Sequence, residues 1–230
     1  MKFMISYSQE KDIWNYLDSV WKFAYIKHGR INLREKLLRN FPQYFKDNLD
    51  KAKTKNEAKK KIIKYLDWYR ENHANTTPVI IDWLQKNLNS KKDEIIHKLE
   101  GVYKEKFPFE KIIVYLTTVN IFPYNFKERW FMSGKNQDLR SHIKIALHEL
   151  NHFMFYYYYS DLKKELGNER YEVLKEALAI YTNPGGNDKP AVKKLENYFK
   201  ENLNKSIPDI LKKGKWRNYL TKGRQAPVFG

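Results

Sequence analysis

The chain contains no cysteine among its 230 residues. Neither a disulfide framework nor a cysteine-based zinc ribbon can therefore stabilise it. It also lacks an apolar run long enough to span a membrane, which takes about 20 residues. The opening segment from Met1 to Ser8 is too short an apolar run for a signal peptide. If Met1 is the native start, we expect a cytoplasmic protein, whereas a removed leader would allow secretion.

Acidic residues are scarce relative to basic ones. The sequence has 44 Lys and Arg against 27 Asp and Glu, a formal net charge of +17. Solvated, lysine-rich helix faces explain such a balance, and attraction to an acidic partner is the alternative. No nucleic-acid motif accompanies the charge, since there is no glycine-rich phosphate loop and no RNA-binding aromatic signature. Aromatic residues make up 16% of the chain, which argues against disorder.

The most informative segment reads His148-Glu149-Leu150-Asn151-His152, an H-E-x-x-H motif. Two histidines four residues apart lie on one face of a helix, so both imidazoles can bind one Zn²⁺. The glutamate beside them can then act as general base on a water at the metal. At about 100° per residue, the opposite face carries an apolar stripe, made of Ile143, Ala146, Leu150, Phe153 and Tyr157. A core face and a separate histidine face are what a buried zinc helix requires.

A catalytic zinc ion usually has a third protein ligand, with the fourth position left to water. His142 lies six residues before His148, which rotates it off the histidine face. Downstream acidic residues are Asp161, Glu165, Glu169, Glu172 and Glu176. Glu165 to Glu172 lie among lysines and arginine, including Lys175, and read as a solvated face. Glu176 opens a stretch with no other charge, and the small Ala177 and Ala179 permit close helix packing. We therefore expect Glu176 as third ligand, with a structural ion pair as the alternative.

The HELNH motif followed on a second helix by KEALA resembles the gluzincin class of zinc metallopeptidases, the thermolysin and aminopeptidase type. The resemblance covers roughly residues 110 to 185. It implies zinc as cofactor, a peptide or protein as substrate, and His148, His152 and Glu176 as ligands. It further implies that Glu149 is the general base of peptide hydrolysis. Two rival interpretations stay open: a zinc-bearing protein that is inactive or acts on another bond, and a basic nucleic-acid-binding protein with an incidental motif.

The sequence also suggests groups that would bind the substrate. Zincins generally bind substrate as an added strand on the edge of their sheet. The resemblance suggests the segment that leads into the zinc helix for this role, namely Trp130, Phe131, Met132 and Ser133. An ordinary core strand is the alternative. Tyr181 and Tyr171 are candidates for stabilising the oxyanion, because both flank the Glu176 segment.

Periodicity and turn residues predict an α+β, zincin-like fold, mostly helical, with a small mixed sheet before the zinc helix. Strands are expected at residues 3 to 7, 111 to 120 and 128 to 134. Helices are expected at residues 10 to 28, 44 to 73, 78 to 106, 138 to 159, from about 168 to 183, 188 to 203 and 206 to 213. We predict a helical N-terminal region over residues 1 to 106 and a catalytic region over residues 107 to 230.

Overall fold

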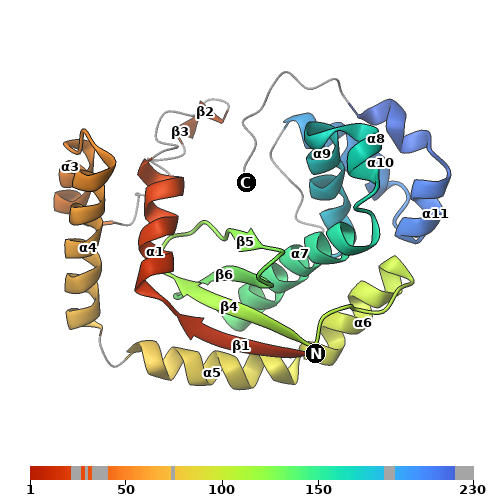
Figure 1. Cartoon of the computed structure of the whole chain (residues 1–230). Coiled ribbons are helices and arrows are strands. Elements are labelled where there is room, and N and C mark those ends of the chain that lie inside the picture. The colour runs from red at the N-terminus through yellow and green to blue at the C-terminus, as the bar shows by residue number, and fades with distance from the viewer. Residues whose placement is uncertain (22–26, 29–30, 33–40, 74–75, 184–189, 221–230) are drawn as a thin grey trace. The chain divides into compact units, whose positions relative to one another are not determined.

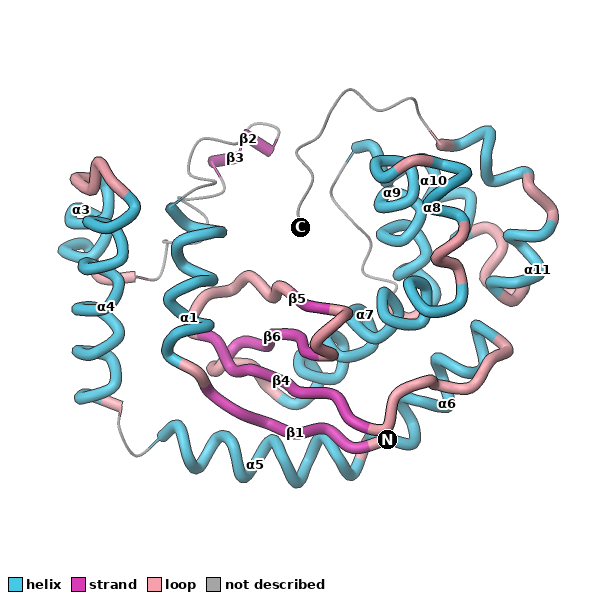
Figure 2. Tube along the Cα trace, viewed as in Figure 1, coloured by secondary structure: helices cyan, strands magenta, loops and turns pink. Residues whose placement is uncertain are grey.

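The computed structural model describes residues 1–21, 27–28, 31–32, 41–73, 76–183 and 190–220. Most of them are helical, and four short strands form a mixed sheet (Figure 2), so the predicted α+β class is confirmed. The chain forms two compact units. We call Lys2–Asn89 with Lys111–His142 the sheet unit, and Ser90–Glu110 with Ile143–Gly230 the helical unit. Both units are discontinuous in sequence, so they do not follow the predicted division at residue 106.

The sheet has the strand order β1-β4-β6-β5 (Figure 1). Strands β1 (Lys2–Tyr7), β4 (Lys111–Thr117) and β6 (Trp130–Gly134) are parallel to one another, and β5 (Tyr124–Asn125) runs antiparallel to β6. All three predicted strands are confirmed. Alternate residues such as Phe3, Ile112 and Val114 are fully buried, which explains the β-branched and aromatic pattern.

Strand β6 is not an edge strand, so the predicted edge position of Trp130 to Ser133 is wrong. Trp130 and Phe131 pair with β4 on one side and with β5 on the other. All five residues of β6 are buried. The short strand β5 lies only a few residues before β6 in the chain and pairs with it. The sequence did not reveal this strand because two residues carry no periodicity. The edges of the sheet are β1 and β5.

Helix α5 (Thr76–Ser90) lies along the edge strand β1 (Figure 1). Gln85 accepts a hydrogen bond from the backbone N–H of Ile5 at 2.9 Å and donates one to the carbonyl of Phe3 at 2.7 Å. Asn89 does the same at Phe3, with both distances 3.0 Å. Side-chain amides thus satisfy backbone groups that an edge strand would otherwise leave open.

The remaining elements of the sheet unit are helical, apart from the small antiparallel pair β2 (Lys27–His28) and β3 (Ile31–Asn32). They are α1 (Gln9–Asn15), the π-helical segment η1 (Tyr16–Trp21), α3 (Gln43–Asp50) and α4 (Lys55–Asn72). The predicted helix over residues 10 to 28 is therefore wrong at its end, where a strand pair forms, and residues 22–26 lie outside the described part. One core cluster joins η1, α3 and α4: Tyr16, Leu17, Phe45, Leu49, Ala58, Ile62, Tyr65, Leu66 and Val119.

A buried carboxylate attaches α1 to the carboxyl end of β4. Asp12 accepts hydrogen bonds from the hydroxyl of Thr117 at 2.6 Å and from the backbone N–H of Thr118 at 3.2 Å. Burial raises the pKa of Asp12, and the hydrogen bonds from both threonines act in the opposite direction. Ser8 caps the same helix by accepting from the N–H of Lys11.

The helical unit contains α6 (Lys92–Tyr103), most of α7 (Leu139–Tyr158), α8 (Leu162–Leu166), α9 (Asn168–Leu178), α10 (Pro190–Lys200) and α11 (Ile207–Lys212). Two 3-10 segments follow α9 and α11, at Ala179–Tyr181 and Lys215–Tyr219. The predicted break between α8 and α9 is confirmed at Gly167, whose φ of 75° suits glycine. Helix α10 packs on α9, and α11 packs on α6. Among the described residues, no helix has the length and apolarity that a membrane span requires.

Candidate metal centre

Helix α7 carries the H-E-x-x-H motif and matches the predicted bounds within a residue at each end. Ala146, Leu150 and Phe153 on its predicted core face are fully buried, whereas Tyr157 at the end of that stripe is exposed. The histidine side is enclosed as well, since His152 is only 1% exposed. A buried imidazole needs polar partners, and those of His152 come from His148, which is half-buried, and from α9.

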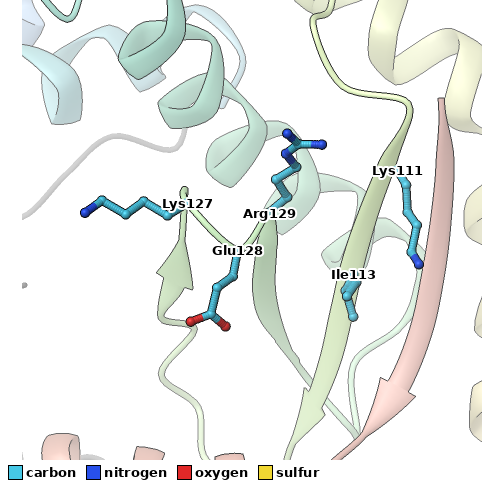
Figure 3. Close-up of a pocket in the computed structure, with 5 residues that line it drawn as sticks. All are labelled: Lys111, Ile113, Lys127, Glu128 and Arg129. Carbon is cyan, nitrogen blue, oxygen red and sulfur yellow. The ribbon is translucent and has the colours of Figure 1, made fainter.

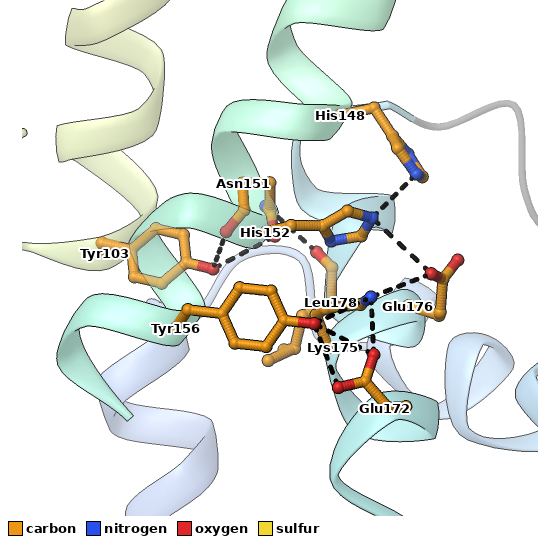
Figure 4. Close-up of polar contacts among 9 residues, drawn as sticks. All are labelled: Tyr103, His148, Asn151, His152, Tyr156, Glu172, Lys175, Glu176 and Leu178. Carbon is orange, nitrogen blue, oxygen red and sulfur yellow. Dashed lines mark hydrogen bonds and ion pairs between the residues drawn. The ribbon is translucent and has the colours of Figure 1, made fainter. Parts of the chain in front are cut away.

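His148 and His152 face each other one helical turn apart. Their Nε2 atoms are 3.0 Å apart, and the rings are nearly perpendicular. Nε2 of His152 also lies 3.7 Å from Oε1 of Glu176, which α9 contributes. Figure 4 shows the three side chains converging from the two helices. The ligand atoms of His148, His152 and Glu176 all lie within 4.8 Å of one another.

This donor set fits a zinc ion. Ligand atoms held about 2.0–2.2 Å from a tetrahedral ion are roughly 3.3–3.5 Å from one another. The separations of 3.0 Å and 3.7 Å bracket that spacing, and all three ligand atoms lie within 4.8 Å of one another, so the three groups can hold one ion. Two imidazoles and one carboxylate are also the ligand types of many catalytic zinc sites, which keep one position open. The predicted ligand Glu176 therefore has a position that suits the role.

Polar contacts hold α7 against α9 at this point. Asn151, within the motif, donates to the carbonyl of Leu178 at 3.4 Å. Tyr103 of α6 donates to the carbonyl oxygen and to Oδ1 of Asn151, at 3.0 and 3.1 Å. Because Leu178 lies two residues after Glu176, these bonds fix where the carboxylate meets the histidines (Figure 4).

A second group of charged side chains adjoins Glu176 and was missed by the sequence reasoning. Lys175 is only 3% exposed, although the pattern indicated a solvated position. Its Nζ lies 2.8 Å from Oε2 of Glu172 and 3.3 Å from Oε1 of Glu176. The hydroxyl of Tyr156 donates to both oxygens of Glu172 at 3.0 Å. Tyr156 could have been found from its helix phase, because it follows His152 by four residues.

The proposed base, Glu149, is buried with 6% exposure on the same helix as the two histidines. A carboxylate directly after His148 lies beside the histidine face, close enough in helix phase to serve a water held by the cluster. Ionisable residues with so little exposure are uncommon and often functional. The position is therefore consistent with the predicted role.

The two tyrosines considered for the oxyanion have other contacts. Tyr181 is 7% exposed, and its hydroxyl donates to the carbonyl of Asn202 at 3.2 Å. Tyr171 is 1% exposed and packs its ring against Phe155, with centroids 4.7 Å apart. Burial raises the pKa of both phenols well above the usual range, so both stay neutral. These contacts give both residues a packing role.

Three of the other acidic candidates, Asp161, Glu165 and Glu172, have partners other than the two histidines. Asp161 is exposed and pairs with Lys164 at 3.7 Å, and Glu165 pairs with Arg217. Glu172 is bound by Lys175 and Tyr156 as described above. His142 belongs to the sheet unit, where its Nδ1 shares a 2.7 Å hydrogen bond with the hydroxyl of Ser133. Ser133 is thus a buried partner of a histidine.

A shallow pocket of about 330 Å³ lies in the sheet unit and contains none of the predicted site residues. Figure 3 shows its lining, made of Lys111, Ile113, Lys127, Glu128 and Arg129. The charged ends point in different directions in this view. Glu128 is already engaged, because it accepts a 2.7 Å hydrogen bond from the indole of Trp130. The pocket therefore offers no convergent set of groups for a ligand.

Comparison of the chain with protein-family models, with curated proteins and with solved structures gave no match.

Proposed function

We propose that this protein is a zinc-dependent metallopeptidase of the gluzincin type and that its helical unit carries the metal centre. The observation that supports the proposal most is the convergence of His148 and His152 from α7 with Glu176 from α9. Glu176 lies 24 residues after His152 and on a different helix, so a chance motif on α7 alone would not bring the third ligand to it. The zincin-like architecture is part of this proposal.

In the proposed mechanism, His148, His152 and Glu176 would hold Zn²⁺. A zinc ion there would polarise a peptide carbonyl and lower the pKa of water toward about 7. Glu149 takes the proton from the attacking water as general base. It then returns that proton to the leaving amine as general acid. Burial of Glu149 and His152 keeps bulk water away from these transfers.

The experiment that tests the proposal separates metal binding from hydrolysis. Protein purified without added metal is analysed for zinc and assayed on a broad peptide library, beside Glu149→Gln. An amide is nearly isosteric with the carboxyl group but cannot take a proton from water at neutral pH. We expect one zinc per chain in both proteins and peptide cleavage in the wild type alone, with loss of at least about 100-fold in the variant.

Each other result has a definite meaning. Stoichiometric zinc without cleavage by the wild type would replace the peptidase with a zinc-bearing protein of another kind. Unchanged turnover in Glu149→Gln would remove Glu149 from the role of base. A protein that takes up no zinc, even when zinc is supplied, would refute the metal centre.

A further inference from the structure

The enclosed ammonium group of Lys175 contacts a proposed ligand of the candidate metal centre. Its Nζ is 3.3 Å from Oε1 of Glu176, the same oxygen that lies 3.7 Å from Nε2 of His152. It also donates to the hydroxyl of Tyr156 at 3.3 Å, and its side chain is 4% exposed. A lysine so enclosed requires charge partners, and Glu172 and Glu176 provide two.

The balance of charge is informative. The carboxylates of Glu172 and Glu176 share the ammonium group of Lys175 (Figure 4). This ammonium group therefore compensates charge that a zinc ion would compensate when bound. The ammonium group of Lys175 and a bound zinc ion would both be attracted to Glu176, and the two cations would repel one another.

We propose that Lys175 is a counter-cation of the site: its ammonium group balances the carboxylates of Glu172 and Glu176 and competes with a metal ion for Glu176. This inference rests on the proposed zinc site. Its first consequence is that the helical unit folds without metal, unlike small zinc domains whose folding depends on the ion. Its second consequence is that Lys175 weakens zinc binding, because its charge repels the ion. If Lys175 had only a packing role, its removal would leave the zinc affinity unchanged or lower it.

The test compares Lys175→Leu, Lys175→Arg and the matched control Lys164→Leu, whose lysine on α8 is 88% exposed. Thermal unfolding is followed in excess chelator and in excess zinc, and zinc affinity is measured by competition with a chromophoric chelator. In chelator, we expect Lys175→Leu to unfold about 10 °C below the wild type, because two carboxylates lose their cation. In zinc, the difference shrinks, and the variant binds zinc at least about tenfold more tightly. Lys175→Arg, which keeps the charge, and Lys164→Leu stay close to the wild type.

Should Lys175→Leu not fold without metal, Lys175→Leu combined with Glu172→Gln removes one carboxylate together with the ammonium group. We expect this double variant to fold and to keep the tighter zinc binding. Zinc affinity equal to or weaker than that of the wild type, in either variant, would overturn the inference and leave the metal site standing. A wild type whose unfolding temperature does not respond to zinc would instead overturn the metal site, and the inference with it.

Discussion

Asn151 donates a hydrogen bond from its side-chain amide to the hydroxyl oxygen of Thr182, at 3.2 Å. The residue occupies a variable position of the H-E-x-x-H motif and is fully buried. The hydroxyl of Thr182 in turn donates to the carbonyl of Ala179 at 3.1 Å. One side chain of α7 therefore anchors the turn that follows α9, which places Glu176 relative to the two histidines.

We expect Asn151→Ala to destabilise the protein and weaken the metal site together. Loss of the buried amide leaves polar groups on Thr182 and Tyr103 less well bonded, at a cost of about 1–3 kcal/mol. Residues that orient metal ligands typically contribute about tenfold or more to affinity. Urea unfolding and zinc competition measure the two effects, with Asn197→Ala on the exposed face of α10 as control. Wild-type zinc affinity in Asn151→Ala would show that the amide does not orient Glu176.

Helix α7 could be predicted from sequence because its signal is local. Helical spacing relates the two histidines and also the residues of the apolar stripe. The predicted bounds of α7 therefore agree with the structure within a residue at each end. Glu176 was singled out because the residues after it carry no charge, and the structure does bring it to His152. Both features depend on residues close together in the chain.

Lys175 and β6 could not be predicted because their environments depend on distant segments. A lysine among glutamates has the local pattern of a solvated face, and only the packing of α7 against α9 encloses it. The edge or interior position of β6 depends on β4 and β5, and β5 has just two residues. Pairing of β1 with β4 joins segments more than 100 residues apart, which no periodicity records.

Substitution of any of the three proposed ligands should lower the zinc affinity, whereas substitution of a histidine outside the site should not. We expect His148→Ala, His152→Ala and Glu176→Gln each to lower zinc affinity by more than about 100-fold, since each removes a bond or charge at the ion. His97 on α6 is exposed, so His97→Ala serves as the matched control and should bind zinc like the wild type. Full zinc retention in both His148→Ala and His152→Ala would contradict the site.

Gln85 should protect the edge of the sheet. In Gln85→Ala, the N–H of Ile5 loses its side-chain partner, and the carbonyl of Phe3 loses one of its two side-chain donors but keeps Asn89, which costs about 1–3 kcal/mol. The uncovered edge of β1 should also favour association between chains. Urea unfolding and size-exclusion chromatography at increasing concentration measure these effects. Lys86→Ala, one residue further and exposed, is the control. Equal stability of the two variants would mean that water replaces the amide at no cost.

His142 should make stability depend on pH below neutrality. Its ring is 1% exposed, and burial lowers its pKa from 6.5 to about 4. The folded protein therefore keeps the ring neutral, whereas the unfolded chain takes up a proton below pH 6.5. Stability from this residue is complete above pH 6.5 and is lost as the pH falls toward about 4. At about 1.4 kcal/mol per pH unit, the loss amounts to about 3 kcal/mol.

The measurement compares the wild type with His142→Gln, by urea unfolding in chelator at several pH values. The variant should be less stable at pH 7, because it loses the 2.7 Å hydrogen bond between Nδ1 and Ser133. Its stability should also fall less steeply than that of the wild type between pH 6.5 and about 4. Asp12 and the other carboxyl groups titrate in both proteins, so the difference between the two curves isolates His142. Parallel curves would show that the folded protein protonates this imidazole as readily as the unfolded chain does.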